Sequence, residues 1–151
     1  MKALILASIL ALTGTAALAA GDADSSSTAP KDPVIENAGN ALSKKDWPAA
    51  QAILREALQK IPDNASYHNM FAYAVRKDAN PDMNLVFKHY NEALRLNPKH
   101  RGAHEYIGEA YLMVGNVGKA KEHLGVLDKL CFFPCQEYTD LKKAIAAYEK
   151  K

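Results

Sequence analysis

Apolar side chains recur every three to four residues from Pro33 onward, which is the period of an amphipathic α-helix. The clearest stretch begins at Trp47, where Asp46 is a suitable N-cap and Pro48 lies in the first turn. Pro, Gly, Asn and Asp residues then interrupt the pattern and divide the rest of the chain into further helices. These helices are expected over residues 64–77, 85–96, 103–114, 118–130 and 137–148. The pattern predicts an all-α protein.

The breaks between helices recur at a nearly constant interval. Pro62 and Pro98 are 36 residues apart, and Phe132 follows 34 residues later. The pairs Ala57-Leu58 and Ala93-Leu94 stand at matching positions before the first two breaks. One helix pair cannot cover its own apolar face, whereas stacked pairs can. A period near 34 residues therefore predicts a solenoid of repeated helix pairs.

The third of these repeats, residues 101–134, has the most complete set of motif residues. They are His104, Ile107, Gly108, Tyr111, Ala120, Leu124 and Leu127. The repeats over residues 31–64 and 65–100 match less completely, and the second holds a two-residue insertion near Pro81-Asp82. With these residues the chain resembles the tetratricopeptide repeat (TPR) family, although His104 takes the place of the usual Trp and Phe132 that of the usual Pro. The resemblance covers about four-fifths of the chain.

The resemblance implies an α-solenoid of three TPR-type helix pairs and a C-terminal capping helix over residues 135–150. It also implies a non-catalytic role, because TPR arrays usually bind other proteins along a concave face that the first helix of each pair lines. The helical period gives the predicted partner-binding residues on this face: Asn69, Tyr73, Arg76, Glu105, Glu109 and Leu112. The same row is extended by Ile35, Gly39 and Leu42 at its start and by Thr139 and Lys143 at its end.

The side chains of this predicted groove favour some ligands over others. The groove lacks the Lys- and Arg-rich set that would hold a ligand carboxylate, so an acidic C-terminal peptide is disfavoured. An extended or helical segment with one basic and one apolar anchor suits it better. The helical period alone leaves open that Glu105 and Glu109 are an ordinary solvated face and that Tyr73 is partly core.

Residues 1–20 have the pattern of a secretory signal peptide. Lys2 precedes an apolar run, and Ala17-Leu18-Ala19 is a small-x-small cleavage site, so we expect cleavage after Ala19 or Ala20. A membrane anchor is the alternative, but the apolar run is too short to span a bilayer. The small, polar residues 21–32 predict a flexible leader before a repeat domain over residues 33–150. The expected location is therefore secreted or periplasmic.

Cys131 and Cys135 are the two cysteines of the chain. In an oxidising compartment an even pair is expected to be oxidised, and one helical turn would bring the two Cα atoms within disulfide reach. The alternatives are a redox-active pair, which normally has the CxxC spacing, a pair of free thiols, and a metal site. The metal site would be of the copper type, with Met113 and a histidine as further ligands.

Charge and motifs exclude several classes of function. Nineteen Lys and Arg against seventeen Asp and Glu give a formal net charge of +2, without the strong basic field or basic run typical of nucleic-acid binding. Of the five histidines, His100 and His104 are four residues apart, but His100 is expected in the loop before the helix, so the two need not share a face. No nucleophile elbow, phosphate-binding loop or dinucleotide fingerprint is present. No cofactor and no catalysis are predicted.

Three functional hypotheses follow. The preferred one is a periplasmic scaffold that binds a segment of another envelope protein in its concave groove. The second is a periplasmic metal-handling protein that uses the cysteine pair with Met and His. The third is a structural subunit whose groove is filled by a second copy or by its own leader.

Overall fold

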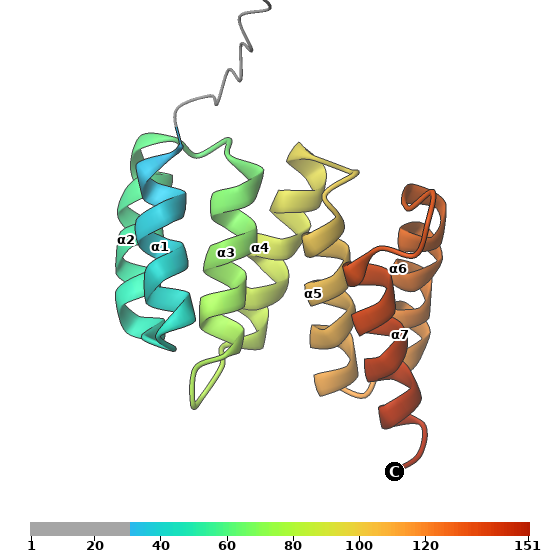
Figure 1. The fold of residues 1–151 in the computed structure, drawn as a ribbon. Coiled ribbons are helices and arrows are strands. Elements are labelled where there is room, and N and C mark those ends of the chain that lie inside the picture. The colour runs from blue at the N-terminus through green and yellow to red at the C-terminus, as the bar shows by residue number, and fades with distance from the viewer. Residues whose placement is uncertain (1–30) are drawn as a thin grey trace, which may run out of the picture.

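The structure, a computed structural model, describes residues 31–151, and these form seven α-helices without a β-strand (Figure 1). The helices are α1 (Pro33–Ser43), α2 (Trp47–Lys60), α3 (Ala65–Arg76), α4 (Met83–Leu96), α5 (Arg101–Met113), α6 (Val117–Leu130) and α7 (Gln136–Tyr148). The predicted all-α architecture is confirmed.

Consecutive helices pack as antiparallel pairs, and the pairs stack side by side (Figure 1). The odd-numbered helices α1, α3, α5 and α7 contact one another in turn, whereas α2, α4 and α6 contact only their neighbours along the chain. The odd-numbered helices therefore form one continuous inner row, and the even-numbered helices form the outer row. This is a TPR-type α-solenoid of three helix pairs, with α7 as a single helix at the C-terminal end.

N-cap side chains explain where the helices begin. Asp82 accepts hydrogen bonds from the backbone N–H groups of Asn84 and Leu85, so α4 begins at Met83, two residues earlier than predicted. His100 caps α5 in the same way, because its Nδ1 accepts from the N–H of Ala103 at 3.2 Å. Because of this cap, α5 begins at Arg101, two residues earlier than predicted.

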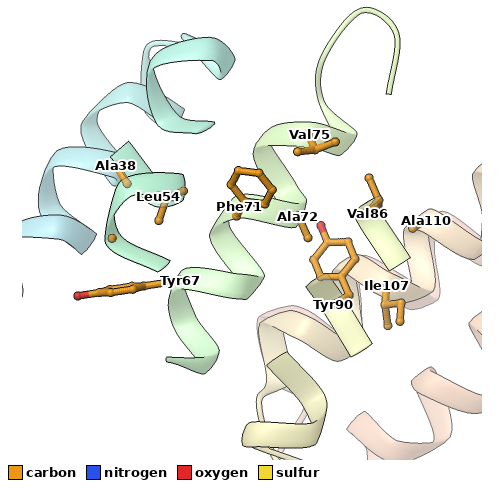
Figure 2. Packing of buried hydrophobic residues seen from close by; sticks show 11 residues of the cluster. Ala38, Leu54, Tyr67, Phe71, Ala72, Val75, Val86, Tyr90, Ile107 and Ala110 are labelled. Carbon is orange, nitrogen blue, oxygen red and sulfur yellow. The ribbon is translucent and has the colours of Figure 1, made fainter. Parts of the chain in front are cut away.

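The apolar core runs without interruption along the stack. One cluster extends from α1 to α5, with Tyr90 as its largest fully buried side chain (Figure 2). A second cluster joins α5, α6 and α7 around Leu127 and Leu141. Small residues bring the helices close together, and Ala38, Ala72 and similar residues have no exposed surface. The core thus provides the continuous apolar seam that stacked helix pairs need.

The N-terminal boundary of the folded domain lies slightly earlier than predicted. Asp32, which the sequence places in the leader, caps α1 and accepts a hydrogen bond of 2.7 Å from the Tyr67 hydroxyl on α3. The predicted signal peptide and residues 21–30 of the predicted leader lie outside the described residues. Among residues 31–151, no helix is long and apolar enough to cross a membrane.

Candidate functional site: the concave groove

The six predicted partner-binding residues all lie on the inner helices α3 and α5, but four of them are nearly covered. Asn69, Arg76, Glu105 and Leu112 expose between 5% and 8% of their surface, whereas Tyr73 and Glu109 are half-buried. The helical period assigned these side chains to one face. It could not show that neighbouring helices cover much of that face.

Arg76 and Glu109 form an ion pair that links α3 to α5. The Arg76 Nη2 atom lies 2.7 Å from Glu109 Oε2, although its N–H bonds are not aligned on a hydrogen-bond acceptor. The Arg76 Nε atom donates a hydrogen bond of 3.3 Å to the hydroxyl of the buried Tyr90. Arg76 therefore holds the stack together as well as lining the groove, and it is less available to a ligand than the sequence suggested.

An aromatic wall stands beside this ion pair. The rings of Tyr73 and Tyr106 are 4.8 Å apart, and Trp47 meets Tyr73 edge-on at 6.2 Å. The Arg76 guanidinium lies 5.5 Å from the centre of the Tyr73 ring and 5.7 Å from that of Tyr106. Tyr106 was not among the predicted residues, and the only signal for it was its position next to Glu105.

Two hollows lie along the inner row. The first, of about 370 Å³, is lined by residues of α1, α3 and α5: Gly39, Leu42, Ser43, Asn69, Met70, Tyr73 and Tyr106. The second, of about 510 Å³, lies towards α7 and includes Arg76, Lys77, Glu109, Leu112, Met113 and Tyr148. The ion pair between Arg76 and Glu109 thus lines the second hollow, and Tyr73 lines the first. Of the residues that extend the row, Gly39 and Leu42 line the first hollow, while the Thr139 hydroxyl donates to the backbone carbonyl of Cys135.

Glu105 is the most unusual titratable group of the groove. Burial, together with the nearby carboxylates of Glu109, Asp140 and Glu137, raises the pKa of its carboxyl to about 7, against the opposing effect of Arg76. At neutral pH this side chain is therefore divided between its protonated and ionised forms. An ordinary solvated glutamate would be fully ionised there.

Cys131 and Cys135 are joined in the loop between α6 and α7, where their Cα atoms are 5.7 Å apart. The pair thus connects the last repeat to the capping helix, as predicted, although it lies in a loop and not on a helical turn. Within this loop Phe132 is 95% exposed, and it directly follows the C-cap residue of α6, as the exposed Pro62 and Pro98 follow those of α2 and α4.

The copper-type alternative lacks a converging set of ligands. The disulfide occupies both sulfur atoms, and Met113 lies at the C-terminal end of α5, near the start of α6 and thus a full helix away from Cys131. Residues 31–151 contain no cluster of three or more His, Cys, Asp or Glu side chains that could hold a metal ion.

Four of the five histidines form two equivalent pairs within the second and third repeats. The Nδ1 atoms of His68 and His89 are 2.8 Å apart, and those of His104 and His123 are 2.9 Å apart. In each pair the Nε2 atom of the first histidine contacts a proline carbonyl, Pro62 or Pro98. A carbonyl only accepts, so this nitrogen carries a proton and the facing Nδ1 of the neutral ring accepts from its partner. The histidines thus serve packing between helices.

No protein-family model matches the chain. The TPR repeat-containing thioredoxin TTL4 of Arabidopsis thaliana is 27% identical to it over 110 residues, which cover 72% of this chain. The matched part is 15% of that protein's length, so the chain spans a small fraction of this relative. The similarity agrees with the TPR-type helical repeats of the structure.

Proposed function

We propose that the protein is a non-catalytic scaffold that binds a segment of another protein in its concave groove. The observation that carries this proposal is the pair of hollows on the inner row, which are lined by aromatic, aliphatic and charged side chains from successive repeats. Together they offer an elongated site with both apolar and polar contacts, as an extended or helical peptide requires.

We further propose that the protein works in the cell envelope, after cleavage of residues 1–19 or 1–20, and that its partner is an envelope protein. The apolar N-terminal segment and the oxidised cysteine pair support this location, because disulfides persist in oxidising compartments. Mass spectrometry of the mature protein tests it. A mass lacking 19 or 20 N-terminal residues is expected, and an intact N-terminus in the cytosol would contradict it.

Site-specific photo-cross-linking in living cells tests the groove. A photoreactive residue at Ser43, which lines the first hollow, or at Lys143 on α7, should capture the same partner. The exposed residues Ala52 and Gln59 on the outer helix α2 are matched control positions and should not capture it. Capture from the outer positions alone would place the interface on the convex face.

Substitution of Tyr73 or Arg76 is a poor test of the same point, since both side chains also stabilise the stack. A variant that lost the partner could have lost it through misfolding. Cross-linking leaves these residues in place, and binding of the captured partner to the purified protein then provides the confirmation.

A further inference from the structure

A hollow on the outer side of the stack combines apolar walls with positive charge. It has a volume of about 390 Å³ and lies between α2 and α4, which do not contact each other, with buried side chains of α3 at its floor. Its apolar walls come from Leu58, Phe71 and Leu85, and its exposed cations are Arg55 and Lys88. The Arg55 guanidinium lies 5.7 Å from the centre of the Phe71 ring, so charge and apolar surface meet directly. We call this site the outer hollow.

The two cations of the outer hollow have no carboxylate partner among residues 31–151. The ion pairs of this part of the chain do not include Arg55 or Lys88, and none of its acidic residues lines the outer hollow. Asp63 and Glu92 line an adjoining hollow together with Lys88, but both lie within 4.0 Å of Arg95. The outer hollow therefore suits an occupant with an apolar body and a negative charge.

The next repeat shows that this chemistry is not required by the fold. The two histidine pairs occupy equivalent places in both repeats, so the packing beneath is shared. The positions that match Leu85 and Lys88, 34 residues later, are Lys119 and Glu122. These two side chains pair with each other at 2.7 Å. The apolar wall and the unpaired cation are thus specific to one repeat, and neither is a requirement of helix packing.

The loop between α6 and α7 presents apolar surface to solvent. The disulfide closes this loop, in which Phe132 is 95% and Phe133 75% exposed, with ring centres 5.0 Å apart. At the equivalent breaks after α2 and α4 the chain has Pro62-Asp63 and Pro98-Lys99, so the fold does not require phenylalanine here. Two exposed aromatic rings offer roughly 300 Å² of contiguous apolar surface, which is typical of a contact site.

Asp128 adds a negative charge beside these rings. It is exposed near the end of α6, lines a small hollow together with Phe132 and Pro134, and forms no ion pair within residues 31–151. The loop and Asp128 therefore have the chemistry that suits the outer hollow, an aromatic body next to a carboxylate. A cavity of about 150 Å³ holds benzene, so the larger outer hollow has room for the Phe132 ring.

We propose that the outer hollow of one copy of the chain receives the Phe132–Phe133 loop of a second copy. The Phe132 ring packs on the apolar walls of the hollow. Asp128 then reaches the rim, where it pairs with Arg55 or Lys88. The loop follows α6, which contacts neither α2 nor α4, so the occupant comes from another copy (Figure 1). The concave groove stays free, and the inference does not depend on the proposed function.

This contact joins two different surfaces of the same chain. Each copy offers one loop and one outer hollow, so the contact is heterologous and copies assemble head to tail. It involves two aromatic rings and a few charges, which is less than a standard interface provides. The association should therefore be weak and should depend on concentration.

Sedimentation velocity of residues 21–151, from micromolar to millimolar concentration, tests the inference. Wild type should shift to species larger than a dimer as the concentration rises. The loop variant Phe132→Ser/Phe133→Ser and the hollow variant Arg55→Glu/Lys88→Glu change only exposed side chains, so both should fold, and each alone should associate at least tenfold more weakly. A mixture of the two should form a dimer that grows no further, because it retains one intact loop and one intact hollow.

Charge reversal tests the proposed ion pair. Asp128→Arg in the hollow variant should restore association, because the charges of loop and hollow are then exchanged. Lys129→Gln is the matched control on the same turn of α6, and it should associate at least as strongly as wild type. A hollow variant that Asp128→Arg does not rescue would overturn the pairing.

Nitrogen-15 NMR of the labelled loop variant, titrated with the unlabelled hollow variant, locates the contact. Shifts should gather at Leu58 and Leu85 and leave Leu42 and Tyr73 of the concave groove unchanged. Wild type that stays monomeric at millimolar concentration, assembly that both variants retain, or shifts confined to the concave groove would overturn the inference. Monomeric wild type that binds phosphatidylglycerol vesicles through the loop would also overturn it, and would assign the exposed rings to a membrane surface. Each of these outcomes leaves the test of the groove function by cross-linking unaffected.

Discussion

Gly108 of α5 and Leu141 of α7 are in such close contact that a Cβ atom on Gly108 would lie 2.6 Å from Leu141 Cδ2. Leu141 has no exposed surface, so its side chain has little room to move away. The absence of a side chain at Gly108 is what allows the capping helix to close the end of the core.

Gly108→Ala should therefore destabilise the protein by about 1–3 kcal/mol, which is the usual cost of overpacking a filled core. Gly125→Ala is the matched control, because Gly125 lies inside α6 with no atom near an added Cβ. It should raise stability by about 0.5–1 kcal/mol through helix propensity. Urea unfolding of both variants checks the sign of each change, and equal effects would show that α7 does not pack on α5 as described.

Loss of the Glu109 charge should leave Arg76 as a buried cation without its carboxylate. We expect Glu109→Gln to lower the free energy of unfolding by about 1–2 kcal/mol, less than for a fully buried pair because Glu109 is partly exposed. The measurement is urea unfolding at pH 6, where repulsion between Glu109 and the largely protonated Glu105 is small. A variant as stable as wild type would show that the ion pair does not stabilise the stack.

Acidic pH should lower the free energy of unfolding of the protein, because its histidine pairs are buried in their neutral form. Burial, together with the facing His68, lowers the pKa of His89 to about 4, and burial with the facing His104 does the same for His123. The unfolded chain binds these protons more readily, so the stability that the neutral rings contribute is complete above pH 6.5 and is lost as the pH falls towards 4. Each ring accounts for about 2 kcal/mol after allowance for its partial exposure.

Urea midpoints at pH 7.5, 6 and 4.5 measure this loss. The measurement is best made in the Glu105→Gln background, because the raised pKa of Glu105 acts in the opposite direction between pH 4.5 and 7. Replacing His89 and His123 by Asn should flatten the profile. An unchanged slope would assign the pH dependence to other groups.

The disulfide should stabilise the end of the solenoid modestly. Its loop is short, so Cys131→Ser with Cys135→Ser is expected to cost about 2 kcal/mol. Hydrogen exchange should locate the loss at α7, because the loop ties this helix to α6. Thiol titration of the wild-type protein in denaturant without reductant should find no free thiol, and two free thiols would contradict the pairing.

The helices and their stacking could be predicted from the sequence, because each repeat carries its own apolar stripe and its own breaks. The disulfide between Cys131 and Cys135 could also be predicted from the sequence, since the two cysteines are close in the chain. These features depend on local spacing, which the sequence displays directly.

The details of the groove depend on distant residues. The burial of Asn69 and the pairing of Arg76 with Glu109 arise from contacts between α3 and α5, which helical period alone does not give. The histidine pairs likewise join residues about twenty positions apart on different helices. Their repetition at equivalent places of two repeats was the only signal available in the sequence.

Glu105 exposes only 7% of its surface between the stacked inner helices, and this burial is the feature that most directly reflects the packing described here. Carbon-13 NMR of the Glu105 side-chain carboxyl, assigned by comparison with Glu105→Gln, measures its titration directly in the unliganded protein. The expected midpoint is near pH 7, because burial and the neighbouring carboxylates disfavour the charged form. A midpoint near the ordinary value of 4.5 would show that water or another group already compensates this charge, and would contradict the account.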